Sequence, residues 1–248
     1  MNHIADVWRQ LETVVDPELD ESVTDMGFIS NIDVDENNCV HIGIRLPTYW
    51  CAANFAFMMA DDMRTALRAL PWVQDTDIVL GEHMYADAIN RGVKQGLSFQ
   101  DTFGDEADGD LDEVRRTFLV KAFQRRQEAL IQYLIQAGHE PGAIVALSIA
   151  ALQALALDGE GQKLVARYLE RRGVIEVFSG SSPAFIAADG RGIPAPELNG
   201  YLAGLRRIRA NAEFNGALCR GLLAVRFDMT TPLVKKCGTV VQPIALNT

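Results

Sequence analysis

The residue best suited to chemistry is Cys51, in the loop of residues 46–52 (Leu-Pro-Thr-Tyr-Trp-Cys-Ala). This loop joins a segment that alternates like a strand, 39–46, to a segment with helical periodicity, 52–70. A cysteine at the start of a helix is favoured as the thiolate, because the helix dipole and unpaired amides stabilise negative charge. The thiolate is the form that binds iron or copper or attacks a persulfide, so we expect Cys51 to be reactive, with Thr48 capping the helix. The alternative is an inert loop cysteine.

A second group consists of carboxylates beside fixed turns. Asp16-Pro17-Glu18 follows the first predicted helix, and Asp25-Met26-Gly27 comes shortly after it. Such carboxylates accept backbone hydrogen bonds or bind a cation. On these residues alone a helix-capping turn is the simpler interpretation. The alternative is that Asp16 and Glu18 act as ligands of a cation.

The remaining cysteines are dispersed, and the sequence has no CxxC pair. Cys39 and Cys219 are expected to be small buried side chains, while Cys237, beside two lysines, could converge with Cys51. A conventional iron–sulfur cluster needs four thiolates. We therefore expect a transient metal site with Cys51, Asp16 and Cys237 as its ligands, and no firmly bound cluster. His41 is expected to be solvated or packed.

The chain lacks the motifs of the common enzyme classes, among them HExxH, the P-loop, GxGxxG and GxSxG. Its net charge is −10, and the acidic residues concentrate before residue 114. Nucleic-acid binding is therefore unlikely for the first half. The opening residues do not look like a signal peptide, and the most apolar segment, 143–157, is shorter than the roughly 20 residues that span a bilayer. We expect a cytoplasmic protein with reduced thiols and no membrane partner.

The predicted elements indicate an α+β domain followed by a mostly helical one. The pattern of residues 1–99 predicts the order helix, strand, strand, helix, strand. This order is typical of a small sheet with helices on one face. Residues 100–113 are acidic and glycine-containing, which is typical of a linker. Residues 114–248 form a helical domain of unknown role, with short strands at 174–178 and 184–187. Its arginines either form solvated faces or dock an acidic partner.

The first hundred residues resemble the iron–sulfur cluster assembly family known as DUF59 or MIP18. The resemblance rests on the order of Asp16-Pro17-Glu18, Asp25-Met26-Gly27 and Thr48 to Cys51. The Pro-Thr-Tyr run is most similar to the branch that accompanies phenylacetyl-CoA monooxygenase. Two features depart from the family pattern: two residues, not three, separate Thr48 from Cys51, and alanine replaces the usual proline after the cysteine.

The resemblance implies a metalloprotein maturation role, with Cys51 as the key ligand or acceptor, supported by Thr48, Asp16 and Glu18. The expected function is that of a chaperone-like accessory factor for a client metalloenzyme, such as a multicomponent monooxygenase. Its partners would be that client or other Fe–S assembly proteins, and a homodimer is compatible with the family. The alternatives are a non-catalytic binding or regulatory subunit, and a thiol enzyme using Cys51 as nucleophile.

Overall fold

The computed structural model describes residues 3–104 and 110–228. Cys237 and the tail from Thr231 on, for which an extended conformation was expected, lie outside the described residues. The chain forms two compact units, one made of residues 1–111 and 215–248 and the other of residues 112–214. Each unit is described by itself. Among the described residues, no helix combines the length and the apolar character needed to cross a bilayer.

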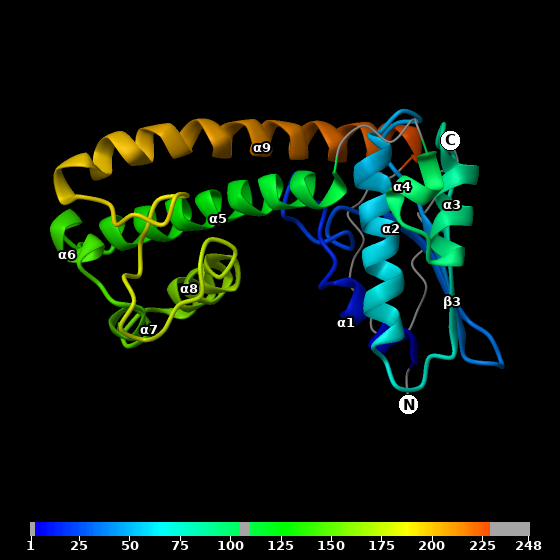
Figure 1. The fold of residues 1–248 in the computed structure, drawn as a ribbon, viewed down its shortest axis with the longest axis horizontal. Coiled ribbons are helices and arrows are strands. Elements are labelled where there is room, and N and C mark those ends of the chain that lie inside the picture. The colour runs from blue at the N-terminus through cyan, green and yellow to red at the C-terminus, as the bar shows by residue number, and fades with distance from the viewer. Residues whose placement is uncertain (1–2, 105–109, 229–248) are drawn as a thin grey trace. The chain divides into compact units, whose positions relative to one another are not determined.

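The first unit has the α+β architecture predicted from the sequence (Figure 1). A small sheet and the helices that pack on it come from the N-terminal part of the chain. Its elements are α1 (His3–Leu11), β1 (Ile29–Val34), β2 (Cys39–Ile44), α2 (Ala53–Arg68), β3 (Asp75–Leu80), α3 (Ala86–Gln95) and α4 (Phe99–Phe103). The predicted linker is therefore helical at its start, where Ser98 caps α4 by accepting a hydrogen bond from the amide of Asp101.

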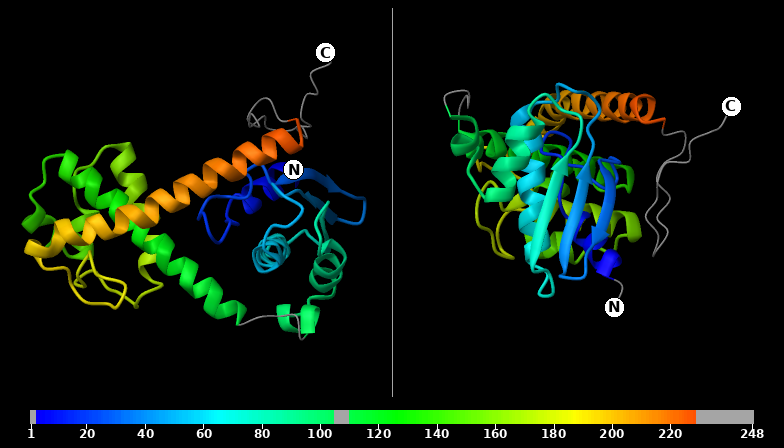
Figure 2. Two further views of the ribbon diagram at one scale, coloured as in Figure 1. Left: turned by 90° about the horizontal axis from the view of Figure 1, so that it is seen from above. Right: turned by 90° about the vertical axis from the view of Figure 1, so that its right-hand side faces the viewer.

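The three strands lie side by side in the order β1-β2-β3 (Figure 2, right). β1 and β2 are antiparallel and form a hairpin, while β2 and β3 are parallel because α2 crosses between them. Side chains alternate across the sheet, so Val40, Ile42 and Ile44 are buried on one face. Cys39 and His41 project from the opposite face, where they are half-buried.

The core of the first unit lies between the sheet and its helices. α2 contributes Phe57, Met59 and Met63, and α3 contributes Ile89 and Val93, all buried against the strand residues. From the C-terminal end of β2 the chain leads through the buried residues Arg45 and Leu46 directly into the Cys51 loop. The sheet and α2 therefore fix both ends of that loop.

The second unit is helical, as predicted. Its elements are α5 (Leu111–Gln136), α6 (Pro141–Val145), α7 (Ile149–Gln153), α8 (Gly159–Arg172), the 3₁₀ helix η2 (Ala195–Glu197) and the first part of α9 (Leu198–Arg226). The apolar segment 143–157 does not form one continuous helix, because Ser148 caps α7 with its side chain and Leu147 accepts a backbone hydrogen bond from Ala184. The short strands expected at 174–178 and 184–187 are absent, and the latter segment makes only an isolated bridge, from Ile186 to Gly192.

Several predicted surface arginines are structural. Arg126 is 9% exposed and binds Glu170 at 2.6 Å, and Arg172 is fully buried with Glu176 at 3.0 Å. These two arginines therefore belong to the interior of the second unit and do not contribute to a docking face.

α9 belongs to both units. Its residues up to Phe214 group with the second unit, and those from Asn215 on group with the first. The boundaries expected from the sequence, 1–99, 100–113 and 114–248, stay a prediction. In the described part of the predicted helical domain, residues 215–228 belong to the first unit.

Candidate functional site

The Cys51 thiol is half-buried directly before α2. Helix α2 begins at Ala53, and Ala52 occupies the N-cap position without a side-chain hydrogen bond. The expectation that Thr48 caps this helix is wrong, because Thr48 lies five residues before the first helical residue. The Thr48 hydroxyl instead lies 3.2 Å from the Cys51 sulfur, within hydrogen-bonding distance. Thr48 thus contacts the thiol itself.

His83 holds the backbone of Cys51 in place. Its Nε2 lies 2.8 Å from the Cys51 carbonyl oxygen, and its Nδ1 accepts a hydrogen bond from the Tyr85 amide at 3.2 Å. Because Nδ1 accepts, the proton of the neutral ring is assigned to Nε2, which donates to Cys51. His83 is 4% exposed. His83 therefore positions the Cys51 loop.

The Asp16-Pro17-Glu18 turn is organised by the Asp16 carboxylate. Its Oδ1 accepts hydrogen bonds from the amides of Glu18 at 2.9 Å and Leu19 at 2.8 Å. Burial raises the pKa of Asp16 from 3.8 to about 6, although these two amide hydrogen bonds act in the opposite direction. The carboxylates of Glu18 and Glu21 raise it further. Asp16 therefore supports the turn, and its charge changes near neutral pH.

The Asp25-Met26-Gly27 turn is fixed by a buried arginine. Gly27 adopts a positive φ of 75°, which favours glycine over residues with a Cβ. Its carbonyl accepts a hydrogen bond of 3.0 Å from Nε of Arg45, which is 7% exposed. This contact ties the turn to the chain between β2 and the Cys51 loop.

The C-terminal part of α9 covers the turn and the loop. Asn215, Cys219 and Leu223 are spaced four residues apart and therefore share one helix face. Asn215 donates to Glu18 at 3.0 Å, and Leu223 is buried in the core of the first unit. One turn further on, Arg226 donates to the Leu46 carbonyl at 3.1 Å.

Cys219 lies between these anchoring contacts. Burial raises the pKa of its thiol to about 11, and Asp16, Cys51 and Glu18 raise it further in that order. Cys219 is thus close enough to the predicted site residues to be affected by their charges. This proximity could not be predicted from the sequence, because no spacing rule connects a cysteine near the end of the chain with a loop at residue 51.

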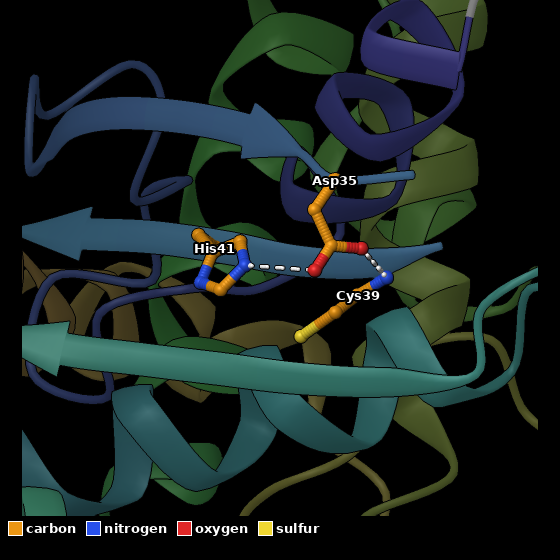
Figure 3. A group of neighbouring side chains, drawn as sticks. All are labelled: Asp35, Cys39 and His41. Carbon is orange, nitrogen blue, oxygen red and sulfur yellow. Dashed lines mark hydrogen bonds and ion pairs between the residues drawn. The ribbon is translucent and has the colours of Figure 1, made fainter. Parts of the chain in front are cut away.

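A separate cluster of metal-ligating side chains lies on the hairpin. Asp35, Cys39 and His41 each offer one ligand atom within 4.8 Å of the others, and no further such trio occurs in the described ranges 3–104 and 110–228 (Figure 3). Cys51 and Asp16 are therefore not part of such a group. The Cys39 thiol has a raised pKa, first through burial and then through the neighbouring carboxylates, beginning with Asp35.

The comparisons with known proteins concern the first unit. The model of a family described as iron–sulfur cluster assembly protein matches residues 4–79. The Fe-S protein maturation auxiliary factor YitW of Bacillus subtilis (strain 168) is 35% identical over 92 residues, which cover 36% of this chain and 88% of YitW. The chain belongs to this family. An uncharacterized protein of Methanocaldococcus jannaschii is 29% identical over 90 residues, covering 36% of this chain and 93% of that protein.

The crystal structure of a DUF59 domain from Bacillus anthracis shares 22% identity, with a TM-score of 0.29, and covers 37% of this chain and 88% of that domain. The family match runs from α1 into β3 and includes Asp16, Glu18, Thr48 and Cys51. It leaves out Cys219 and the whole second unit. The resemblance drawn from the motifs is thus confirmed for the N-terminal domain only.

Proposed function

We propose that this chain is an accessory factor that receives iron or an iron–sulfur cluster at Cys51 and passes it to a client metalloenzyme, such as a multicomponent monooxygenase. The observation that carries the proposal is the position of Cys51, which lies inside the family-matched segment, with its thiol against Thr48 and its backbone carbonyl bonded to His83. The name of YitW, an auxiliary factor for the maturation of Fe-S proteins, supports a role of this class.

The ligands around Cys51 favour transfer over storage. A conventional cluster takes four thiolates, whereas Cys51 belongs to no three-ligand group among the described residues. Its neighbour Cys219 has a raised pKa and is therefore a neutral thiol at physiological pH. Further ligands would then come from a client, an assembly protein or a second copy of the chain. Asp16 and Cys237 remain proposed ligands within the chain, with Glu18 as a support.

Exposed apolar side chains flank the thiol. Trp50, next to Cys51, is 72% exposed, Tyr49 is 52% exposed and Met84 is 49% exposed. The Met84 amide donates to the Tyr49 carbonyl at 2.9 Å, so the two segments lie side by side. Aromatic and methionine side chains are enriched in protein interfaces. A client surface that covers them would shield the cargo from water at the moment of transfer.

The same exposed side chains favour a second candidate function, that of a non-catalytic binding or regulatory subunit. In that case the surface around Trp50 would contact the partner, and the Cys51 thiol would carry nothing. The two candidates differ in their response to substitution. Removing the Cys51 thiol should impair the carrier function and leave the binding-subunit function intact. Removing the Trp50 side chain should impair either function, because both need the partner surface.

The test is anaerobic reconstitution of the full chain with ferrous iron and sulfide, followed by transfer to an apo-ferredoxin. Cys51→Ser is expected to abolish the visible thiolate-to-iron absorption and the transfer, because the sulfur ligand is lost. Both chains of the comparison carry Cys39→Ser, so that the separate cysteine of the hairpin cluster adds no absorption of its own. Transfer by the Cys51→Ser chain at the rate of the chain that keeps Cys51 would reject the carrier function.

The subunit candidate is tested by Trp50→Ala. Val177, which is 97% exposed in the second unit, provides the matched control as Val177→Ala. If the chain is a carrier whose client contacts the side chains around Trp50, Trp50→Ala should slow the transfer of iron or of the cluster and leave its uptake intact. If Cys51→Ser has no effect and Trp50→Ala alone weakens association with a purified partner, the binding-subunit function is the correct one.

A further inference from the structure

The three potential ligands on the hairpin lie at the opposite end of β2 from Cys51. Cys39 is the first residue of β2, His41 lies two residues further on, and Asp35 follows directly after β1. Their side chains project from the same side of the sheet and converge (Figure 3). They offer a sulfur, a nitrogen and an oxygen atom, a set that suits zinc and ferrous iron.

The turn between the strands holds the Asp35 carboxylate in position. Its Oδ1 accepts hydrogen bonds from the amides of Asn37 and Cys39, both at 2.9 Å. Asn38 adopts a positive φ of 58°, which closes the turn. Because Oδ1 is occupied by the backbone, Oδ2 is left facing the His41 ring, 3.7 Å from Nε2. The carboxylate is therefore oriented before any ion arrives.

The other nitrogen of His41 has a carboxylate partner as well. Nδ1 lies 3.4 Å from Oδ2 of Asp77 on the neighbouring strand β3. A histidine that binds a metal commonly donates its second ring N–H to a carboxylate, which fixes the ring and strengthens the ligand. Asp77 is placed to play this orienting part, with Nε2 of His41 facing the ion.

The strand register adds negative charge around the ligands. Asp33 pairs with His41 across the β1–β2 ladder, and Asp75 pairs with Cys39 across the β2–β3 ladder. Arg68 and Lys94 lie near this face, the first 3.1 Å from Asp75 and the second 3.2 Å from Asp77. Acidic residues thus outnumber the basic residues that pair with them, and the surplus favours a cation.

We propose that Asp35, Cys39 and His41 form a binding site for a divalent transition-metal ion of the zinc and ferrous-iron class, with Asp77 orienting His41. A tetrahedral zinc ion with bonds of about 2.0–2.3 Å keeps its ligand atoms roughly 3.3–3.8 Å apart. Atoms already within 4.8 Å of one another reach that spacing by small side-chain rotations. The side chains of Asp35 and His41 are both 38% exposed, which gives the ion access and leaves a fourth coordination position open.

The experiment uses the full reduced chain in which Cys51, Cys219 and Cys237 are replaced by serine, so that Cys39 is the one remaining cysteine of four. Zinc binding is measured by calorimetry, and cobalt is added as a spectroscopic probe. We expect one ion per chain and a near-ultraviolet thiolate-to-cobalt absorption. If the triple variant does not fold, the wild-type chain and its Cys39→Ser variant are compared in the same way.

Further substitutions identify the ligands. Cys39→Ser should abolish the thiolate absorption, His41→Gln should weaken zinc binding at least tenfold, and Asp77→Asn should weaken it by about 10- to 100-fold. His139→Gln, which changes a half-buried histidine of the second unit, is the matched control and should bind zinc normally. If neither Cys39→Ser nor His41→Gln changes the zinc affinity, the proposal is overturned. Since Cys51 is absent from this background, failure here leaves the proposed carrier function untouched.

Discussion

Asn215 donates a hydrogen bond of 3.0 Å to the Glu18 carboxylate, although 197 positions separate the two residues. The contact joins the Asp-Pro-Glu turn of the family-matched segment to a helix that lies outside the match. On the same part of α9, Arg220 binds Glu21 at 2.7 Å and Arg226 binds Glu82 at 3.0 Å. The side chains of Asn215, Arg220 and Arg226 therefore attach the end of α9 to the unit that carries Cys51.

The first prediction concerns Arg226, whose guanidinium donates to the backbone carbonyls of Leu46 and Glu82. Arg226→Ala removes these bonds beside the Cys51 loop and should lower the free energy of unfolding of the first unit by about 1–3 kcal/mol. Urea unfolding followed by tryptophan fluorescence measures this directly. All three tryptophans of the chain, Trp8, Trp50 and Trp72, lie in the first unit.

The control for this prediction is Arg191→Ala. The Arg191 side chain is 84% exposed and pairs with Asp189 on the surface of the second unit. An exposed ion pair contributes little to stability because solvent screens it, so the tryptophan transition should not move. Equal transitions for the Arg226 and Arg191 variants would show that the end of α9 does not stabilise the first unit.

A second prediction concerns His83, which donates to the Cys51 carbonyl from a buried position. His83→Ala leaves that carbonyl without its donor and releases the loop. Alkylation of Cys51 by iodoacetamide should become severalfold faster, as measured by mass spectrometry of the Cys51 peptide. His139→Ala is the matched control in the second unit. A Cys51 rate that is unchanged by His83→Ala would contradict the positioning role.

The motifs predicted the first unit well because its patterns are local. Alternating Val40, Ile42 and Ile44 indicate a strand whichever residues pair with it, and the turn at 35–38 follows from its polar composition. The arrangement of helix, hairpin, helix and strand then leaves few ways to bury the apolar faces. The candidate site residues Asp16, Glu18, Thr48 and Cys51 were chosen through their order along the chain, and their role stays a prediction.

What the sequence did not predict depends on distant contacts. Cys219 approaches the site only because Leu223 is buried against a core formed by other segments. The cluster around His41 depends on strand register, which brings Asp77 from β3 beside it. The hydrogen bond from His83 to the Cys51 carbonyl likewise follows from the fold and not from sequence spacing.

The third prediction uses the raised pKa of the Cys219 thiol, about 11. Because the thiolate is the reactive form, the alkylation rate of Cys219 should keep rising by about tenfold per pH unit up to roughly pH 10. An ordinary cysteine with a pKa near 8.5 would instead approach a plateau above about pH 9. Peptide-resolved mass spectrometry of the wild-type chain gives the rate. A plateau for Cys219 near pH 9 would mean that its thiol is not held in the protonated form.

The last prediction concerns Asp16, whose pKa is raised from 3.8 to about 6 mainly by burial. Between these two values the folded chain holds more protons than the unfolded chain, so ionisation of Asp16 lowers stability as the pH rises from about 4 to about 6. An asparagine at this position cannot ionise, and its side-chain oxygen can still accept the Glu18 and Leu19 amides. Asp16→Asn should therefore gain stability over the wild type as the pH rises, by up to about 3 kcal/mol at neutral pH.

Urea unfolding by tryptophan fluorescence at several pH values between about 4 and 7 measures this difference. Asp25→Asn, at an exposed position in the neighbouring turn, is the control and should show no such gain. A stability difference between Asp16→Asn and wild type that stays flat, or shrinks as the pH rises, would show that the Asp16 carboxyl is not held protonated by its surroundings. Because Asp16 lies beside Cys219 and the Asp-Pro-Glu turn, the same titration would report whether the surroundings of Cys51 gain a negative charge near neutral pH.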